Sequence, residues 1–442
     1  MKIGLIAMSG VHVIDPEVAA VGLTLPGFLD RGKAIASLPS LALLTLAGLT
    51  EKRHQVSYIE VPALSAVAGV PGEFDLVAIS SYSAQIHEAY ELAMRYRALK
   101  IPVVIGGPHV SSLPHEAAQY CDAVAIGEGE PIWNQIVADC EAGQLKPFYG
   151  SQFSSFEMKD APMPAFHLLD PGKYNRLTIQ TSRGCPHRCE FCAASILITN
   201  RYKQKPKEKV LAELDCIQSI WRRPFIEFAD DNSLVNRSFW KNELLPEMAK
   251  RDVRWFAETD LSIADDPELL FKMEQSGCMQ VLIGLESNIA DSLKNMELRA
   301  DYKYRMFNKT REAIQKIQSH GIRVIGCFIL GLDGQRIEAI DSLYDYVGEL
   351  GLFDVQLTIQ TAFPGTPLYA RLKSEGRILE DDRWDKCTLF DVNFKPSDMS
   401  VDELRQGFIN LIDRIYSREA AAKRQQEFKR SLRNLRTLRV AS

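Results

Sequence analysis

The sequence lacks the features that mark membrane and secreted proteins. No uninterrupted apolar run reaches the roughly 20 residues that a membrane-spanning helix requires. The N-terminal stretch MKIGLIAMSGVHVID has neither the apolar core nor the small-residue cleavage site of a signal peptide. We therefore expect a cytoplasmic protein. In that reducing compartment the nine cysteines, an odd number, are not expected to form disulfides.

Neither charge nor repetition dominates the chain. The net charge is −5 and the isoelectric point is near 6.0, so no overall basic field favours nucleic acid as a partner. We find no short-period repeat and no low-complexity tract. With 442 residues, 46% of them hydrophobic, the chain is long enough for two or three globular domains. Its function must be sought in a local site.

The first third of the chain alternates apolar strands with amphipathic helices. Strands are predicted at residues 2–8, 55–61, 74–82, 102–107 and 122–130, and helices at 39–54, 87–100 and 131–143. This alternation indicates a parallel sheet covered by helices. The sequence therefore predicts a doubly wound, Rossmann-like α/β domain over residues 1–145.

Loops rich in glycine and serine follow three of these strands, with the sequences SSYSAQ, GGPHVSSLP and GEGEP. In an open parallel sheet the ligand binds outside the carboxyl ends of the strands. Glycines there allow the backbone to approach a large flat or phosphorylated ligand closely, although each glycine alone fits a tight turn equally well. Three such loops in register favour a ligand site.

A second α/β unit follows a predicted linker at residues 146–174. Strands are predicted at 176–182, 224–231, 253–259, 279–287, 323–332 and 354–364, with helices at 206–220, 236–251, 266–277 and 308–321 between them. Six strand–helix repeats predict an open, partial (β/α)6 barrel over residues 175–372. Residues 373–442 are expected to form a small, mostly helical C-terminal region.

Three cysteines, Cys185, Cys189 and Cys192, follow the first strand of the barrel within TSRGCPHRCEFCAAS. Loops at the carboxyl ends of the strands carry the chemistry of βα barrels, so this is an active-site position. A structural zinc site would need a fourth ligand, which His187 is able to supply. An iron–sulfur cluster held by three thiolates instead leaves one iron open to a ligand, which predicts one-electron chemistry.

The spacing CxxxCxxC, with Phe191 before the last cysteine, resembles the radical S-adenosylmethionine (radical SAM) superfamily, and the resemblance covers about residues 175–370. It implies a [4Fe–4S] cluster on Cys185, Cys189 and Cys192, which are both metal ligands and catalytic. It also implies S-adenosylmethionine chelated to the open iron, and a 5′-deoxyadenosyl radical that removes a hydrogen from the substrate. An external one-electron reductant such as flavodoxin or ferredoxin is implied as well.

Other segments match the pattern of the same superfamily. FADDN lies where the family binds the methionyl amine, IGLES ends the fourth strand, and GCFILGLDGQ resembles the segment that supports adenine. Glu258, in AETD, is expected to meet the ribose hydroxyls or the substrate, whereas Asp260, Asp265 and Asp266 are interpreted as helix caps. The cofactor-binding residues implied in this half are Phe191, Asp230, Asp231, Glu258, Gly284, Glu286 and Gly331. The two aspartates replace a glycine-rich version of the family's segment.

The N-terminal series of strands and loops resembles the cobalamin-binding domain of the B12-dependent branch of this superfamily. TAFPGTPLY and LFDVNFKPSDMSVDELRQGF also resemble that branch. The DxHxxG motif, with which some cobalamin enzymes offer a lower axial histidine, is absent. The resemblance implies cobalamin contacts at Ser80, Ser81, Gly106, Gly107, His109, Gly127 and Glu128. His109 is interpreted as a turn residue near the corrin amides rather than as a cobalt ligand.

The two resemblances together imply a cobalamin-dependent radical SAM C-methyltransferase that acts on an unactivated carbon of a small molecule, lipid or tetrapyrrole. One alternative is a radical SAM enzyme for oxidation, cyclisation or rearrangement, with cobalamin in another role or absent. A non-catalytic iron–sulfur or corrin sensor is an alternative of a different class, although no output domain is recognisable. The basic C-terminal tail, with leucines at helical spacing, leaves open a peripheral membrane contact or a packed, solvated helix.

Overall fold

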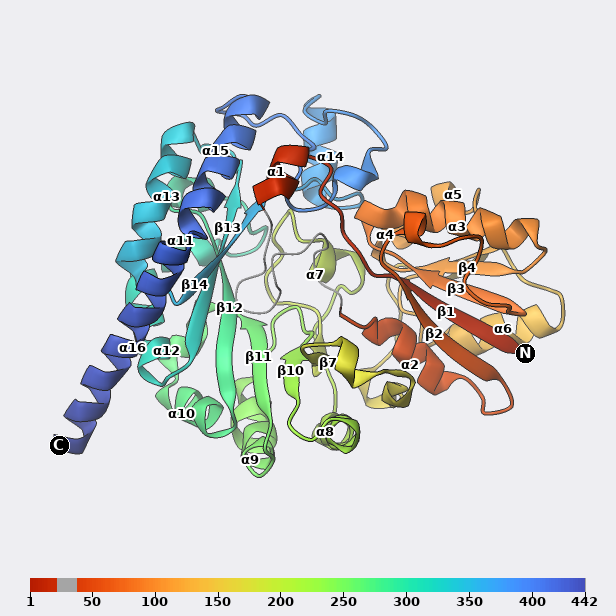
Figure 1. Cartoon of the computed structure of the whole chain (residues 1–442), viewed down its shortest axis with the longest axis horizontal. Helices are drawn as coiled ribbons and strands as arrows, with labels where there is room; N and C mark the ends of the chain where they lie inside the picture. Colours follow the sequence, from red (N-terminus) through yellow and green to blue (C-terminus); the bar gives the residue numbers. More distant parts are fainter. Residues whose placement is uncertain (22–37, 442) are drawn as a thin grey trace.

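The computed structural model describes residues 1–21 and 38–441, with side chains up to Arg433. Two six-stranded parallel sheets lie side by side, and the C-terminal helices pack against the second of them (Figure 1). No helix within the described residues is both long and apolar enough to cross a membrane. The predicted α/β class, with a Rossmann-like unit followed by a partial barrel, is confirmed.

The first sheet has the strand order β2-β1-β3-β4-β5-β6. Its strands are β1 Lys2–Met8, β2 Gln55–Val61, β3 Leu76–Ser80, β4 Val103–Gly106, β5 Ala123–Ile126 and β6 Phe148–Gly150. The five predicted strands are present. β6 lies in the segment expected as a linker, because a three-residue strand that follows Pro147 and ends at Gly150 is too short to show an alternating pattern. The domain boundaries stay predictions.

Helices cover both faces of this sheet because its strands are apolar on both sides. The helices are α2 Leu41–Leu49, α3 Ile86–Ala98, α4 Pro108–Ser112, α5 Pro114–Ala117 and α6 Trp133–Glu141. Ile3 and Leu5 of β1 belong to the core under α2 and α6, whereas Ile6 and Met8 belong to the core under α3. The strand thus buries successive side chains in two separate cores.

The second sheet has the order β14-β13-β12-β11-β10-β7, in which each strand pairs with its neighbour in this series. Its strands are β7 Leu177–Ile179, β10 Phe225–Phe228, β11 Arg254–Thr259, β12 Cys278–Glu286, β13 Arg323–Leu330 and β14 Asp354–Ile359. The covering helices are α8 Lys207–Ile220, α9 Leu245–Met248, α10 Pro267–Gln275, α12 Thr310–Ser319 and α13 Ile337–Leu350. A sequential parallel order of this kind is an open barrel.

The helix predicted at 236–251 is instead a π-helical stretch, Phe239–Leu244, followed by the short helix α9. Pro246 explains the change, because it has no N–H to donate to the carbonyl group four residues earlier. A short antiparallel pair, β8 Ser182–Arg183 and β9 Lys203–Gln204, projects from the carboxyl end of the barrel. The remaining short helices are α1 Pro16–Val21, α7 Ala193–Leu197 and α11 Tyr302–Met306.

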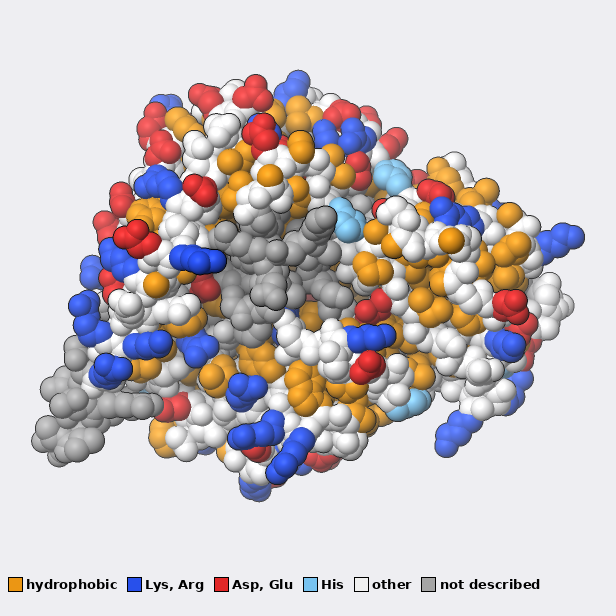
Figure 2. Space-filling model, viewed as in Figure 1, with side chains coloured by type: hydrophobic (Ala, Val, Ile, Leu, Met, Phe, Trp, Pro, Cys, Tyr) orange, Lys and Arg blue, Asp and Glu red, His pale blue; other side chains and the backbone are white. Residues whose placement is uncertain are grey.

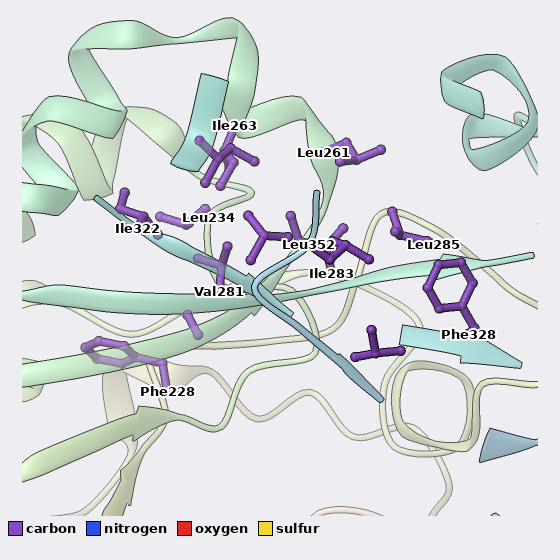
Figure 3. Packing of buried hydrophobic residues seen from close by; sticks show 14 of the residues in the cluster. Phe228, Leu234, Leu261, Ile263, Val281, Ile283, Leu285, Ile322, Phe328 and Leu352 are labelled. Carbon is purple, nitrogen blue, oxygen red and sulfur yellow. The ribbon is translucent and has the colours of Figure 1, made fainter. Parts of the chain in front are cut away.

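Alternation along β12 separates the barrel core from its lumen. Val281, Ile283 and Leu285 belong to the hydrophobic cluster that includes Phe228, Ile263 and Phe328 (Figure 3). The intervening Leu282, Gly284 and Glu286 line a cavity on the opposite side, which Leu285 also reaches near the end of the strand. Because successive side chains of a strand point to opposite faces, the same strand seals the core and supplies the site.

The C-terminal region consists of α14 Pro367–Ser374, α15 Val401–Ile415 and α16 Arg418–Ala441. Ser400 and Glu403 form a capping box that starts α15. α16 is held to the barrel by an ion pair between Arg424 and Asp354 at 3.3 Å and by packing of Phe428 on Phe353. The basic tail therefore begins as a helix packed on the barrel. The structure does not describe the side chains of Leu435 and Leu438.

Gly277, at the turn between α10 and β12, should not tolerate a side chain. Its φ is +88°, and an added Cβ would overlap the carbonyl oxygen of Val253. We expect Gly277→Ala to cost about 2–4 kcal/mol through backbone strain and displacement. The matched control is Gly348→Ala in α13, where an added Cβ meets nothing and helix propensity predicts a gain of up to about 1 kcal/mol.

Thermal unfolding of the two variants, measured beside the parent protein, tests this contrast. A melting temperature that falls only for Gly277→Ala agrees with the geometry of the turn. Equal melting temperatures for the two alanine variants would contradict it.

Candidate functional site

A cavity of about 230 Å³ opens at the carboxyl ends of β10–β13, inside the partial barrel. Cys185, Cys189 and Cys192 line one wall, and Phe191 and Ser195 extend it. Leu293, Phe307 and Tyr346 form an apolar wall beyond the ends of β12 and β13. The three predicted thiols are therefore brought to one cavity at the active-site end of the barrel.

Two adjacent aspartates after β10 hold the start of the cysteine loop. Asp230 accepts hydrogen bonds from the backbone N–H groups of Thr181, at 2.6 Å, and Ser182, at 2.9 Å. Asp231 accepts one from Gly184 N–H at 2.6 Å. Burial raises the pKa of Asp230 to about 6, against the effect of these hydrogen bonds. The pair thus fixes the backbone directly before Cys185.

The loop continues through a tight arrangement of the cysteines. Cys192 N–H donates to the Cys189 carbonyl at 3.0 Å, and Ser195 Oγ donates to Cys192 Sγ at 3.2 Å. Burial raises the thiol pKa of Cys185 to about 11 and that of Cys189 to about 12, and it also raises that of Cys192. Thiols in such surroundings ionise only beside a cation, so the donor set fits an iron–sulfur cluster.

The zinc alternative finds no support in the geometry. Among the described residues, no group of three His, Cys, Asp or Glu side chains converges so as to hold a metal ion. His187 instead contacts Asp260 at 3.3 Å and stacks on Tyr302 with ring centroids 4.7 Å apart. In a [4Fe–4S] cluster each thiolate binds a different iron, so the three sulfurs need not converge on one point.

Lys303 of α11 brings a positive charge into the cavity. Its ammonium donates to the Gly284 carbonyl at 3.0 Å and pairs closely with the Glu286 carboxylate. Burial opposes the charge, but Glu286 raises the pKa of Lys303 above its usual value. Glu286 adopts φ +64°, and a Cβ at Gly284 would overlap Glu286 Oε1 and approach Lys303 Nζ. Gly284 is thus required by the ion pair.

The opposite side of the cavity is acidic. Glu258 projects into the hollow, where it is accessible to solvent yet surrounded by protein. Burial, with a further contribution from Glu227, raises the pKa of Glu258 to about 8. Asp260 caps the next turn by accepting from Ser262 N–H at 2.8 Å, which confirms the predicted cap, and it also accepts from Asn232 at 2.8 Å.

Most of the residues predicted in this half line the cavity, and two do not. The lining includes Cys185, Cys189, Phe191, Cys192, Asp231, Glu258, Gly284 and Glu286. Asp230 is buried behind the loop. Gly331 has φ +89°, and its Cα faces Leu404 of α15 and Phe394, so this glycine is required for packing of the C-terminal region. Gly331 therefore does not line the cavity, and its predicted part in cofactor binding stays a prediction.

Sequence reasoning did not select Lys303, Tyr302 or Asn232 as site residues, although all three line the cavity. Lys303 and Tyr302 come from a single-turn helix without a motif or a periodic pattern. Asn232 is the exception, because it directly follows the aspartate pair in FADDN. Its place at a strand end was the one signal available.

A second cavity, of about 300 Å³, lies at the carboxyl ends of β3, β4 and β5. Its glycine-rich wall comprises Ser80, Gly106, Gly107, Gly127, Glu128 and Gly129. Leucines of α2 and Trp133 of α6 supply an apolar wall, and Gln180, Arg183 and Ala229 close it from the barrel side. The cavity is thus an apolar crevice between the two halves, where the sequence predicts a ligand.

Ser81 and His109, predicted as cobalamin contacts, are not among the residues that line this crevice. The ring nitrogens of His109 contact Ser83 Oγ at 3.0 Å and Glu116 at 3.3 Å. Ser81 Oγ donates to the Tyr82 carbonyl at 2.9 Å. Both side chains therefore have protein partners, and the predicted cobalamin contacts of Ser81 and His109 stay predictions.

Glu128 links the crevice to the cysteine loop. Its carboxylate accepts from Lys203 Nζ at 2.7 and 2.9 Å and from Arg183 Nη1 at 2.7 Å, while Glu130 accepts from Arg183 Nη2 at 2.8 Å. Burial opposes ionisation of Glu128, but these partners hold its pKa below the usual range. The residue predicted as a cobalamin contact is therefore engaged in ion pairs between the two halves.

Comparison with known proteins agrees with this division of the chain. Residues 31–137 match the family model of the B12 binding domain, and residues 179–347 match that of the radical SAM superfamily. Residues 366–441 match a domain of unknown function (DUF4070).

The curated relatives that match over most of the chain include two named methyl-transferring enzymes. Bacteriochlorophyllide d C-12(1)-methyltransferase of Chlorobaculum tepidum is 29% identical and covers 88% of this chain and 85% of its own length. Hopanoid C-2 methylase of Rhodopseudomonas palustris is also 29% identical, over 78% of this chain and 66% of that protein.

Among solved structures, the fold is shared with two cobalamin-containing radical enzymes. The radical S-adenosylmethionine methyltransferase TsrM from Kitasatospora setae, solved with cobalamin and a [4Fe–4S] cluster, has a TM-score of 0.63 at 17% identity, over 85% of this chain and 78% of that one. The cobalamin-dependent S-adenosylmethionine radical enzyme OxsB has a TM-score of 0.68 at 14% identity. The match covers 94% of this chain and 67% of that one.

The order of the two matched domains, each with its own cavity at the carboxyl ends of its strands, decides the assignment. The cofactors of this domain pair are a [4Fe–4S] cluster, S-adenosylmethionine and cobalamin. The chain belongs to the cobalamin-dependent radical SAM enzymes, in which a B12-binding domain precedes a radical SAM domain.

Proposed function

We propose that this enzyme transfers a methyl group to an unactivated carbon of a small molecule, a lipid or a tetrapyrrole. The observation that carries the proposal is that a single chain holds a thiol-lined cavity and a glycine-lined crevice, and that Arg183 of the crevice stands two residues before Cys185 of the cavity. The relatives named above, which methylate a bacteriochlorophyllide and a hopanoid, support methyl transfer to carbon. When bound, the cluster and S-adenosylmethionine supply radical chemistry, and cobalamin supplies a transferable methyl group.

Different side chains of the barrel cavity are proposed to bind the cluster and the separate groups of S-adenosylmethionine. Cys185, Cys189 and Cys192 are the proposed cluster ligands, held in place by the aspartate pair after β10. Lys303 is the cation that faces the carboxylate of S-adenosylmethionine, because Glu286 and the Gly284 carbonyl hold its ammonium at the cavity wall. The apolar wall of Leu293 and Phe307 suits the adenine ring.

The acidic side of the cavity is the proposed binding place of the methionyl ammonium group of S-adenosylmethionine and of the substrate. Asp231 lines the cavity beside the cysteine loop and suits the methionyl ammonium. Glu258 has no side-chain partner among the described residues and projects into the hollow, so it is free to hydrogen-bond the substrate. Its raised pKa favours the protonated form, which is able to donate a hydrogen bond.

The crevice between the halves is the proposed cobalamin site. Ser80, Gly106, Gly107 and Gly127 expose backbone there, and the apolar wall fits the flat nucleotide base of the cofactor. We also propose a cytoplasmic location and a small reducing protein, such as flavodoxin or ferredoxin, as the electron donor. The basic helix α16 is a candidate for peripheral membrane contact, since lipid substrates reside in membranes.

One relative favours a second candidate. Anaerobic magnesium-protoporphyrin IX monomethyl ester cyclase of Cereibacter sphaeroides is 24% identical over 78% of this chain, and its name indicates cyclisation. The mass of the product separates the two reactions. Reconstituted enzyme with cobalamin, a reductant and methyl-deuterated S-adenosylmethionine should add a deuterated methyl group to a tetrapyrrole or hopanoid. A product without added methyl favours cyclisation or oxidation, and failure to consume S-adenosylmethionine favours the sensor.

Single replacements of Cys185, Cys189 and Cys192 by alanine should abolish the visible absorption of the cluster and the formation of 5′-deoxyadenosine. Each variant removes one of three thiolates that hold separate irons. Iron content, absorption and nucleoside release are measured after anaerobic reconstitution. Cys216→Ala is the control, because Cys216 lies on α8 away from both cavities. Radical cleavage retained in any of the three variants would refute the ligand assignment.

Lys303→Met should weaken binding of S-adenosylmethionine by at least about 30-fold, since truncation leaves the buried Glu286 charge unpaired beside the ligand carboxylate. The dissociation constant is measured calorimetrically on protein that carries its cluster. Removal of both charges in Lys303→Met/Glu286→Gln should restore part of the affinity, because the repulsive carboxylate is gone. Unchanged affinity in Lys303→Met, with Lys316→Met as a surface control, would exclude this role.

Gly106→Leu should fill the crevice and prevent cobalamin uptake while leaving cluster assembly intact. An added Cβ at Gly106 has only ordinary contacts, so a longer side chain extends into free space rather than into the core. Cobalt analysis and the absorption spectrum of bound cobalamin provide the measurement. Full cobalt occupancy in this variant would place the cofactor elsewhere.

A further inference from the structure

Residues 294–311 form a basic segment within a chain that is acidic overall. The segment has six lysines and arginines against two acidic residues, whereas the whole chain has a net charge of −5. Figure 2 shows charges of both signs interspersed over one face of the molecule. The basic residues are Lys294, Arg299, Lys303, Arg305, Lys309 and Arg311, and the acidic ones are Glu297 and Asp301. This local reversal of sign needs a physical reason.

The segment is hydrogen-bonded directly to the cysteine loop. Glu190 N–H donates to the Met296 carbonyl at 2.9 Å, and Leu298 N–H donates to the Arg188 carbonyl at 2.9 Å. Between these two bonds, Glu297 and Cys189 form an isolated antiparallel β-bridge. The backbone of the basic segment therefore flanks a proposed cluster ligand on both sides.

The two acidic residues of the segment are directed to its own backbone. The Glu297 carboxylate, which is buried, accepts from the N–H groups of Arg299 at 2.9 Å and Ala300 at 2.7 Å, and from Arg188 N–H at 3.2 Å. Asp301 accepts from Asn295 N–H at 2.9 Å. Both carboxylates thus stabilise the bend.

Two large apolar side chains are exposed among these cations. Leu298 is 52% exposed and Tyr304 is 37% exposed, and Lys294 Nζ lies 5.1 Å from the centre of the Tyr304 ring. Lys294, Arg299 and Arg305 of the same segment are also exposed. Lys294 pairs with Asp291 at 2.6 Å, and Arg299 Nη1 donates to the Pro186 carbonyl at 3.5 Å. Apolar residues with a charged rim are typical of small, transient protein interfaces, in which the charges speed encounter and select the partner.

We propose that this surface docks an acidic protein that carries single electrons, of the ferredoxin or flavodoxin class. The docking patch comprises Lys294, Leu298, Arg299, Tyr304 and Arg305. The inference rests on the proposed function, because only an iron–sulfur site behind Cys189 needs an electron delivered there. One electron leaves the carrier and one enters the cluster, and no bond forms or breaks. Electron tunnelling falls steeply with distance, and one β-bridge separates this surface from Cys189.

Binding of the carrier is measured first, without any turnover. Protein that carries its cluster, without S-adenosylmethionine, is titrated with oxidised flavodoxin and, separately, with oxidised ferredoxin, at low and at high ionic strength. We expect one of the two to bind, with an affinity that falls as salt rises. Lys294→Glu/Arg305→Glu should weaken that binding at least tenfold, because it reverses two charges of the rim. Leu298→Gln should weaken it without changing its salt dependence.

The matched control is Lys423→Glu/Lys429→Glu, which makes the same charge change at exposed positions of α16. This variant should bind the carrier as the parent protein does. Binding by neither carrier, binding that is independent of salt, or equal loss in the control and patch variants would overturn the proposal. Phosphatidylglycerol vesicles that bind the parent but not the patch variant, with carrier affinity unchanged, would assign the patch to a membrane instead.

Activity then separates this inference from the proposed function. With dithionite, a small reductant that needs no docking site, the patch variant should form 5′-deoxyadenosine at the parent rate. With the reduced carrier protein, its apparent KM for the carrier should rise at least tenfold. Equal losses with both reductants would show that the segment supports the cluster rather than a partner. Absence of nucleoside from the parent enzyme with dithionite would refute the proposed function, while the binding result would still stand.

Discussion

The buried carboxylate of Glu128 ties the two halves of the enzyme together. Its side chain is fully buried, and both of its charged partners, Arg183 and Lys203, come from the β8–β9 pair of the barrel half. A buried charge that loses one partner costs about 3–5 kcal/mol, so the halves resist separation or rotation at this point. Since Arg183 stands two residues before Cys185, the crevice wall and the cysteine loop share one anchor. The two cavities thus keep a fixed relation.

Two aspartates after β10 likewise have more than one role, because they accept hydrogen bonds from the backbone of the cysteine loop. A glycine-rich segment at this place would leave the N–H groups of residues 181–184 to water or to the ligand. Asp230 and Asp231 instead satisfy three of them inside the protein. Asp230 is buried behind the loop, while Asp231 also lines the cavity. One short motif therefore combines a structural role with a ligand-facing one, which sequence alone does not separate.

The sequence predicts the fold of this protein better than the details of its site. Buried parallel strands such as β1 and β12 are continuous apolar runs, and the three cysteines are close in sequence, so pattern and spacing identify both. Lys303 could not be selected in this way, because its place depends on how a short helix 17 residues beyond Glu286 folds back over β12. Gly331 and His109 do not line the two cavities for a related reason. Their motifs predict a turn, but not which neighbour the residue in the turn contacts. Gly331 packs against Leu404 of α15, and His109 contacts Glu116.

The charges around the barrel cavity impose a direction on a zwitterionic ligand. Lys303 stands on the β12 side, and Asp231 stands beside the cysteine loop at the end of β10. A third fixed negative charge at Glu258 would repel Asp231 and Glu227 in surroundings of low polarity. The raised pKa of Glu258, near 8, removes that charge at neutral pH. Glu258 therefore offers a hydrogen-bond donor on a side of the cavity that Asp231 and Asp260 keep acidic, and a substrate with a hydrogen-bond acceptor would suit this place.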